Sequence, residues 1–364
     1  HAVVTHARDT LALLRLWAYP AGAMNARAVV RSTGFYLPER EVSNEELQSR
    51  LPAENAGFAE EMAAKTDVQR RFYAPDDWAT SDLALRACQD ALQRADVPAT
   101  DIDLIIVGSD SPDYITPSTS VVLQHKLGAT KAGTYDVGCA CASFPTALAS
   151  AGGLMMTNPS LKKVLVVGAY MMHKLAPLDA PMSFFYGDGA GAALLERREG
   201  LSDDHGVLQA AFRADGSFAK QWAILSGGTA EPASAESVAA GRTQVRVYKN
   251  YPPYLNNEGW PALARALSEN NGFSLDDVDR YIFTQVRRST IEGAMDNLGQ
   301  PHDKAEFIMH KYGYTGSACI PMALHDAIVD GRAKAGELIV MVGSGVGLNQ
   351  AGVALRLTED LVTA

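Results

Sequence analysis

The hydrophobic and polar positions of the chain predict strands and helices in alternation from residue 26 onward. Residues 102–108 and 164–169 are short, nearly continuous apolar runs, which is the pattern of strands buried on both faces. Residues 81–95 instead place their apolar side chains at helical spacing. Further strands are expected at residues 28–38, around Tyr135, and at residues 187–196, 276–285 and 337–345. Further helices are expected from Ser43 and at residues 118–127, 260–270 and 315–329.

The second half of the chain repeats the pattern of the first. Residues 101–107 and 276–282 each place acidic residues ahead of an apolar strand that follows a helix. Strands and helices that alternate in two similar halves, residues 25–200 and 201–364, imply stacked α/β layers with parallel-rich sheets. Residues 226–242 are rich in Gly, Ala, Ser and Thr, which predicts a loop on the surface or over a site.

Composition and charge narrow the class of protein. The chain has 364 residues, 47% of them hydrophobic, which is enough for two domain-sized cores or one large duplicated core. A net charge of −10 argues against nucleic acid as the main partner. No apolar stretch approaches the roughly 20 residues of a membrane span, so no membrane partner is expected.

Residues 1–24 are expected to be an upstream extension or a tag remnant. The chain opens with His1, and Met24 is followed by a run that resembles a natural start. A secretory leader is disfavoured because Arg15 interrupts the apolar part and Asp9 lies where a basic residue belongs.

The cysteine spacing points to a reducing compartment. The four cysteines have neither the spacing of a disulfide framework nor that of a metal site: Cys88, Cys139, Cys141 and Cys319. We therefore expect a cytoplasmic protein with no metal ligand set.

Cys141 is the candidate nucleophile. Its neighbours, residues 134–144, predict a strand, a tight turn of small residues and then a helix with a sulfur in its first turn. A helix N-terminus stabilises a thiolate, which predicts a lowered pKa for Cys141. The alternative is a buried cysteine that serves only packing. Cys139, at the end of the strand, is expected to be structural.

Several motifs, in order along the chain, resemble one enzyme family. The runs concerned are Thr66-Asp-Val-Gln-Arg-Arg, Asp136-Val-Gly-Cys-Ala-Cys-Ala-Ser-Phe, Tyr186-Gly-Asp-Gly-Ala-Gly-Ala, Gly313-Tyr-Thr-Gly-Ser-Ala-Cys-Ile-Pro and Gly343-Ser-Gly-Val-Gly-Leu. From about Ala26 to Leu357 the chain resembles the thiolase superfamily, and within it β-ketoacyl-acyl-carrier-protein synthase III. Agreement of ordered motifs with the α/β pattern makes the resemblance specific.

The resemblance implies a fold, an assembly and a reaction. The fold is the five-layered αβαβα arrangement, and the protein is a homodimer. A tunnel admits the pantetheine arm of coenzyme A or of an acyl carrier protein, which serves as substrate rather than as a bound cofactor. The cysteine takes an acyl group from a thioester, and the enzyme then usually decarboxylates a malonyl thioester and joins the two.

The resemblance also places two substitutions in the family's catalytic triad. Thr284 stands where the family has its His, and Tyr314 stands where it has its Asn. Both carry a hydroxyl donor, but neither is a base near neutral pH. The oxyanion hole would consist of the backbone N–H groups of Cys141 and Val346, the latter at a family Gly. His310 is a less favoured replacement for the lost base.

The entrance for the cofactor arm departs from the family as well. Glu61 and Lys65 fall where the family holds coenzyme A with a Trp and an Arg. Lys65, Arg287 and Arg288 are therefore the candidate phosphate contacts. Alternatively, these three cationic side chains are ordinary solvent-exposed surface residues with no ligand.

Taken together, the sequence predicts an acyltransferase that forms an acyl-Cys141 thioester from acyl-coenzyme A or acyl-carrier protein. The product would be a carbon–carbon bond in fatty-acid, polyketide or other secondary-metabolite synthesis. Two alternatives remain open. One is transfer to an oxygen, nitrogen or sulfur acceptor without decarboxylation, and the other is a non-catalytic subunit that only binds acyl groups.

Overall fold

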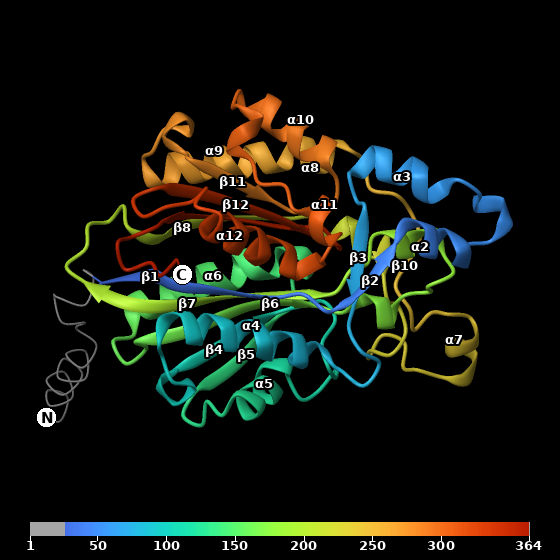
Figure 1. The fold of residues 1–364 in the computed structure, drawn as a ribbon, viewed down its shortest axis with the longest axis horizontal. Coiled ribbons are helices and arrows are strands. Elements are labelled where there is room, and N and C mark those ends of the chain that lie inside the picture. The colour runs from blue at the N-terminus through green and yellow to red at the C-terminus, as the bar shows by residue number, and fades with distance from the viewer. Residues whose placement is uncertain (1–25, 364) are drawn as a thin grey trace, which may run out of the picture.

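The computed structural model describes residues 26–363, and these form two stacked β-sheets with helices outside and between them (Figure 1). The expected extension, residues 1–24, lies outside the described residues. No helix in the described part of the chain is long and apolar enough to cross a membrane.

The first sheet has the strand order β1-β7-β6-β4-β5. Its strands are β1 (Ala26–Tyr36), β4 (Leu104–Gly108), β5 (Gly133–Val137), β6 (Lys163–Tyr170) and β7 (Gly189–Glu199). Strand β4 runs parallel to both β5 and β6, whereas β7 runs antiparallel to β6 and β1. Gly108 pairs with Val137 on one side and with Gly168 on the other, so the three parallel strands end at one edge.

The second sheet has the order β11-β12-β13-β8. Its strands are β8 (Gly206–Ala214), β11 (Arg280–Phe283), β12 (Leu338–Gly345) and β13 (Asn349–Arg356). Only β11 and β12 pair in parallel, because β13 and β8 continue the sheet antiparallel. Both sheets are therefore mixed, and the expectation of parallel-rich sheets was wrong. The division of the chain at residue 200 into two halves stays a prediction.

The helices complete the five α-β-α-β-α layers that the sequence predicted (Figure 1). Helices α4 (Thr80–Ala95) and α5 (Thr119–Leu127) cover the outer face of the first sheet. Helix α9 (Gly259–Asn271) covers the second sheet, with α8 (Tyr254–Asn257) and α10 (Arg288–Leu298) beside it.

Between the sheets lie α6 (Ser143–Thr157) and α12 (Cys319–Val329). Every residue of α12 except Val329 is buried, and α6 is apolar on most of its surface. A helix that is apolar around its circumference can only be stable when it is covered on all sides. This explains why these two helices, rather than the amphipathic α4, occupy the centre.

Smaller elements gather at one end of the molecule, on the right in Figure 1. They are β2 (Arg40–Ser43), α2 (Asn44–Arg50), α3 (Phe58–Thr66), β3 (Arg70–Tyr73), α7 (Ala235–Ala239) and β10 (Arg246–Val247), which pairs with β9 (Trp222–Ala223). Helix α11 (Met309–Tyr312) lies nearer the middle of the molecule and contacts β3. Ser43 caps α2 as expected, since its hydroxyl accepts from the N–H of Glu46 at 3.1 Å. The predicted loop at residues 226–242 contains the short helix α7.

Candidate active site

Cys141 lies in a sharp turn between strand β5 and helix α6. The turn is a short 3₁₀ helix, Ala140–Ala142, and the thiol-bearing residue is 6% exposed. Ala140 has a φ of 49°, a left-handed conformation that residues with a side chain rarely adopt. The N–H of Cys139 donates to the hydroxyl of Ser143 at 2.9 Å, which ties the two ends of the turn together. This local structure fixes the position of the sulfur.

Tyr314 reaches the sulfur from the other half of the chain. Its phenol hydroxyl donates a hydrogen bond to Sγ of Cys141, and its side chain is buried. Its backbone forms a bridge with Tyr186. The preceding residue, Gly313, has a φ of 74° and leaves no room for a Cβ, which would lie 2.7 Å from the carbonyl oxygen of Arg70. The structure thus brings together two residues that the sequence singled out.

The end of strand β12 packs directly against the Cys141 turn. A Cβ on Gly345 would lie 2.0 Å from the carbonyl oxygen of Cys139, and one on Gly343 would lie 2.9 Å from that of Cys141. Only glycine allows so close a backbone approach. The approach places the turn that contains Val346, which is half-buried, next to the Cys141 turn.

Thr284 is buried behind this strand end. Its N–H donates to the carbonyl of Val342 at 3.2 Å, and its hydroxyl accepts from the N–H of Ser344 at 2.9 Å. The hydroxyl is therefore engaged with the backbone of β12, and the bond that reaches the sulfur comes from Tyr314 instead.

The environment of Cys141 corrects one prediction from the sequence. Burial, the negative charge of Asp110 and the second thiol of Cys319 all raise the pKa of Cys141, whereas the hydrogen bond from Tyr314 lowers it. We expected the helix N-terminus to lower the pKa of Cys141. In the structure, burial and nearby negative charge raise it instead. A thiolate therefore requires a group that accepts the proton.

Asp110 is a site residue that the sequence analysis missed. It follows β4 by two residues and is partly buried, and the Ser317 hydroxyl lies 3.4 Å from its Oδ1. Burial raises the pKa of Asp110 to about 6. Its place at the carboxyl end of a strand parallel to β5 was the signal that could have identified it, since such strand ends line sites in α/β sheets.

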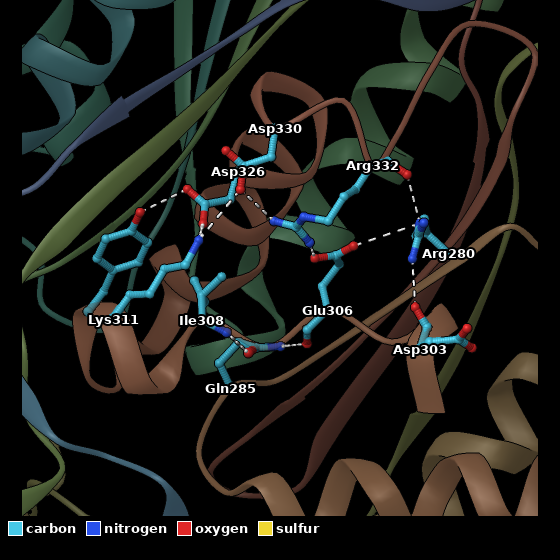
Figure 2. A network of polar contacts seen from close by, with 10 residues as sticks. Arg280, Gln285, Asp303, Glu306, Ile308, Lys311, Asp326, Asp330 and Arg332 are labelled. Carbon is cyan, nitrogen blue, oxygen red and sulfur yellow. Dashed lines mark hydrogen bonds and ion pairs between the residues drawn. The ribbon is translucent and has the colours of Figure 1, made fainter. Parts of the chain in front are cut away.

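A polar network holds the segment that leads to Tyr314 (Figure 2). The side-chain amide of Gln285 donates to the carbonyls of Phe283 at 2.8 Å and of Glu306 at 2.9 Å. Its oxygen accepts from the N–H of Ile308, also at 2.8 Å. Gln285 therefore joins the end of β11, where Thr284 lies, to the segment before α11.

The same network fastens α11 to the central helix α12. Lys311 and the hydroxyl of Tyr312 both bind the carboxylate of Asp326, at 2.7 and 2.9 Å. The buried carboxylate of Glu306 pairs with Arg332. Because Lys311 and Tyr312 belong to α11 and Glu306 lies just before it, these contacts fix the backbone that leads to Tyr314.

The expected phosphate contacts do not gather at one place. Arg288 pairs with Asp67 at 2.7 Å and stacks over the ring of Phe307. It lines an open groove of about 600 Å³ with Glu41, Ser43, Glu45, Asp67, Gln69, Arg70 and His310. Lys65 pairs instead with Glu61, and Arg287 is an exposed residue that precedes α10.

His310 lies in the groove rather than among the contacts of the thiol. Burial lowers the pKa of His310, and the charges that act on it are those of Asp67, Arg288, Lys311 and Asp326. Among residues 26–363 there is no group of three or more His, Cys, Asp or Glu side chains that could hold a metal ion.

Comparison with known proteins agrees with this geometry. The chain matches the family models described as 3-oxoacyl-[acyl-carrier-protein (ACP)] synthase III over residues 135–216 and its C-terminal region over residues 268–357. It is 34% identical to β-ketoacyl-[acyl-carrier-protein] synthase III of Syntrophomonas wolfei over 328 residues, 90% of this chain and 96% of that protein. It is also 34% identical to the protein of the same name from Rhodobacter capsulatus over 336 residues, 92% of this chain and all of that protein.

Solved structures give the same result. The fold is similar to the 3-oxoacyl-[acyl-carrier-protein] synthase III of Aquifex aeolicus, with a TM-score of 0.78 and 26% identity over 91% of this chain and 99% of that one. A priming β-ketosynthase of a polyketide biosynthetic pathway is similar with a TM-score of 0.81 and 28% identity, over 91% and 96% of the two chains. The thiolase-like fold, the ordered motifs and these relatives establish that the chain belongs to the β-ketoacyl-[acyl-carrier-protein] synthase III family.

Proposed function

We propose that this protein is an acyltransferase that accepts an acyl group from a thioester onto Cys141, as the first half of a β-ketoacyl-acyl-carrier-protein synthase III reaction. The observation that carries the proposal is the hydrogen bond from the Tyr314 hydroxyl to the sulfur of Cys141. A donor aimed at sulfur stabilises the thiolate that attacks the thioester. Cys141 is thus the nucleophile, and Tyr314 supports it.

The carbonyl oxygen of the donor needs hydrogen bonds as negative charge develops on it. We assign these to the N–H groups of Cys141 and Val346, since β12 lies against the nucleophile turn at Gly343 and Gly345. Thr284 takes the place of the family His and Tyr314 that of the family Asn. In this assignment Thr284 holds β12, because its hydroxyl bonds to the N–H of Ser344.

The acyl donor is a thioester of coenzyme A or of an acyl carrier protein. The groove contains the guanidinium groups of Arg288 and Arg70, which pair with Asp67 and Glu41 and are the cations open to a phosphate. Lys65 lies on α3 and Arg287 immediately before α10. Arginine suits this contact because its planar fork matches phosphate oxygens.

We infer a homodimer in the cytoplasm. The loop after β4 exposes Tyr114 by 58% and Ile115 by 81%, and large apolar side chains exposed together are typical of an interaction surface. All four cysteines are free thiols, which suits a reducing compartment. Light scattering during gel filtration measures the mass in solution.

The acyl-enzyme is tested by intact-protein mass spectrometry after mixing with acetyl-, butyryl- and octanoyl-coenzyme A. An acyl adduct is expected on the wild type and is expected to be absent from Cys141→Ala. A wild type that forms no adduct with these donors or with the corresponding acyl carrier proteins supports the non-catalytic binding subunit instead. An adduct that persists in Cys141→Ala contradicts the role of Cys141.

A second candidate is acyl transfer to an oxygen, nitrogen or sulfur acceptor. Both hydroxyls that replace the family His and Asn already have partners, in Ser344 and Cys141, and neither is a base. Release of carbon dioxide when the acylated enzyme meets malonyl-coenzyme A or malonyl carrier protein indicates condensation. Its absence, with an intact acyl-enzyme, favours the non-decarboxylating transfer.

A further inference from the structure

Asp110 lies at the edge of the first sheet from which the nucleophile emerges. Strand β4 ends at Gly108, which pairs with Val137 of β5 and Gly168 of β6. Asp110 lies two residues after Gly108, and Tyr170 lies two residues after Gly168. Strand β5 continues after Val137 into the turn that contains Cys141. The charge of Asp110 acts on Cys141, as well as on the phenols of Tyr170 and Tyr186 and the thiol of Cys319.

These neighbours leave the Asp110 carboxylate without a compensating charge. The thiols and phenols around it have raised pKa values and are therefore uncharged near neutral pH. Its side-chain hydrogen bond is the one from Ser317, at 3.4 Å, and no described lysine, arginine or histidine pairs with it. Enclosure without a cation explains why its pKa rises to about 6.

Two other aspartates beside the strands of the first sheet serve the fold in visible ways: Asp136, which is exposed, and Asp188, which is buried. Asp136 accepts from the N–H groups of Thr119 and Ser120 at the start of α5, at 2.7 and 2.8 Å. Asp188 accepts from the N–H of Ala74 and pairs with His173. Asp110 fixes neither a helix end nor an ion pair, so its carboxylate adds an energetic cost for which the fold gives no structural reason.

We propose that Asp110 is the proton acceptor of this site: its carboxylate takes the proton of the Cys141 thiol as the acyl group is loaded. This inference rests on the proposed acyl-Cys141 intermediate and adds to it the base that Thr284 and Tyr314 cannot supply. A carboxylate that titrates near the working pH is suited to accept a proton and return it.

The step balances within the groups named. The S–H bond of Cys141 breaks, its proton moves to a carboxylate oxygen of Asp110, and the sulfur forms a bond to the carbonyl carbon of the donor thioester. The tetrahedral intermediate then collapses, and the carbon–sulfur bond of the donor breaks. The leaving thiolate takes the proton from Asp110, which is thereby ionised again.

A purely electrostatic role and a proton-accepting role predict opposite effects of Asp110→Asn. The amide removes a negative charge that raises the pKa of Cys141. If the charge alone mattered, the variant would hold more thiolate and react faster with every electrophile. If Asp110 accepts the proton, transfer from a thioester becomes slower, by ~10²–10⁴-fold for a lost general base.

The experiment measures both reactions on the wild type, Asp110→Asn and the control Asp96→Asn. Asp96 is an exposed residue in the left-handed conformation at the end of α4, where asparagine is well tolerated. Alkylation of Cys141 by iodoacetamide reports the thiolate, and acylation by acetyl-, butyryl- and octanoyl-coenzyme A reports the transfer, both by intact-protein mass spectrometry at pH 7.

We expect acylation of Asp110→Asn to fall at least ~100-fold while its alkylation stays equal or becomes faster. We expect Asp96→Asn to match the wild type in both. Acylation of Asp110→Asn within threefold of the wild type overturns the proposal and leaves the acyl-enzyme intact. An equal loss of both reactions also overturns it, since Asp110 would then only support the structure of the site. A wild type that forms no adduct refutes the proposed function itself.

Discussion

The substitution Asp110→Asn is expected to stabilise the protein at pH 8 and to leave its stability unchanged at pH 4. Burial raises the pKa of Asp110 from 3.8 to about 6. The folded protein therefore holds a proton on Asp110 that the unfolded chain has already released in this interval. The proton on Asp110 therefore stabilises the folded protein in acid. This stabilisation is lost as the pH rises through the pKa that Asp110 has in the folded protein. Above it, an ionised carboxylate must remain enclosed.

The magnitude follows from the size of the pKa shift. A shift of about two pH units corresponds to ~3 kcal/mol, at ~1.4 kcal/mol for each unit. Asp110 is only partly buried, so water screens its charge and this value is an upper limit. Asparagine has nearly the same shape and does not titrate. The variant should therefore gain ~1–3 kcal/mol over the wild type between pH 4 and pH 8.

Urea unfolding followed by tryptophan fluorescence at several pH values measures this difference. Asp96→Asn removes the same charge from an exposed position and should give a difference from the wild type that does not change with pH. A difference for Asp110→Asn that is equally flat would refute the reasoning, as would a variant that is less stable than the wild type at pH 8. Either result would mean that the fold does not enclose the charge at a cost.

Four other substitutions test the site. Tyr314→Phe removes the hydroxyl that donates to Cys141, so alkylation by iodoacetamide at pH 7 should slow by roughly tenfold or more, a result that an unchanged rate would contradict. Thr284→Ala should cost ~1–3 kcal/mol in urea unfolding with acylation within about tenfold of wild type, whereas a much larger loss of rate at unchanged stability would make Thr284 part of the chemistry. Gly345→Ala should lower the melting temperature and abolish acylation, because its Cβ would lie 2.0 Å from a backbone oxygen; a stable and active variant would disprove the close approach. Arg288→Ala should raise the KM for acyl-coenzyme A about tenfold with little change in kcat, and an unchanged KM would remove Arg288 from the donor site.

The sequence predicted best the elements whose pattern does not depend on distant partners. Strand β4 is a continuous apolar run because it is buried on both faces, and α4 has one apolar stripe because it lies on a sheet. Strand β8 was missed because most of its residues are exposed or half-buried, which gives no clear alternation. Missing β8 and β13 also concealed the antiparallel half of the second sheet.

The same distinction between local pattern and distant partners applies to the residues of the candidate site. The sequence singled out Cys141 and Tyr314 as candidates because local motifs contain them, and the structure joins the two by a hydrogen bond. Asp110 was missed because an aspartate between two serines after a strand is typical of a loop. Its character depends on strands and helices that enclose it from elsewhere in the chain. The pKa of Cys141 was expected to fall for the same reason, since the sequence shows the helix start but not the enclosure.

The hydrogen bond between Tyr314 and Cys141 joins residues that are 173 positions apart, one after a strand of the first sheet and the other just before the central helix α12. The site therefore exists only while the two halves of the molecule remain docked. Each sheet could keep its own backbone hydrogen bonds if the layers separated slightly, and spectroscopy of secondary structure would register almost nothing. The reactivity of Cys141 therefore reports whether the layers that contain Cys141 and Tyr314 remain packed together. It detects their separation more sensitively than any measurement of helix or strand content.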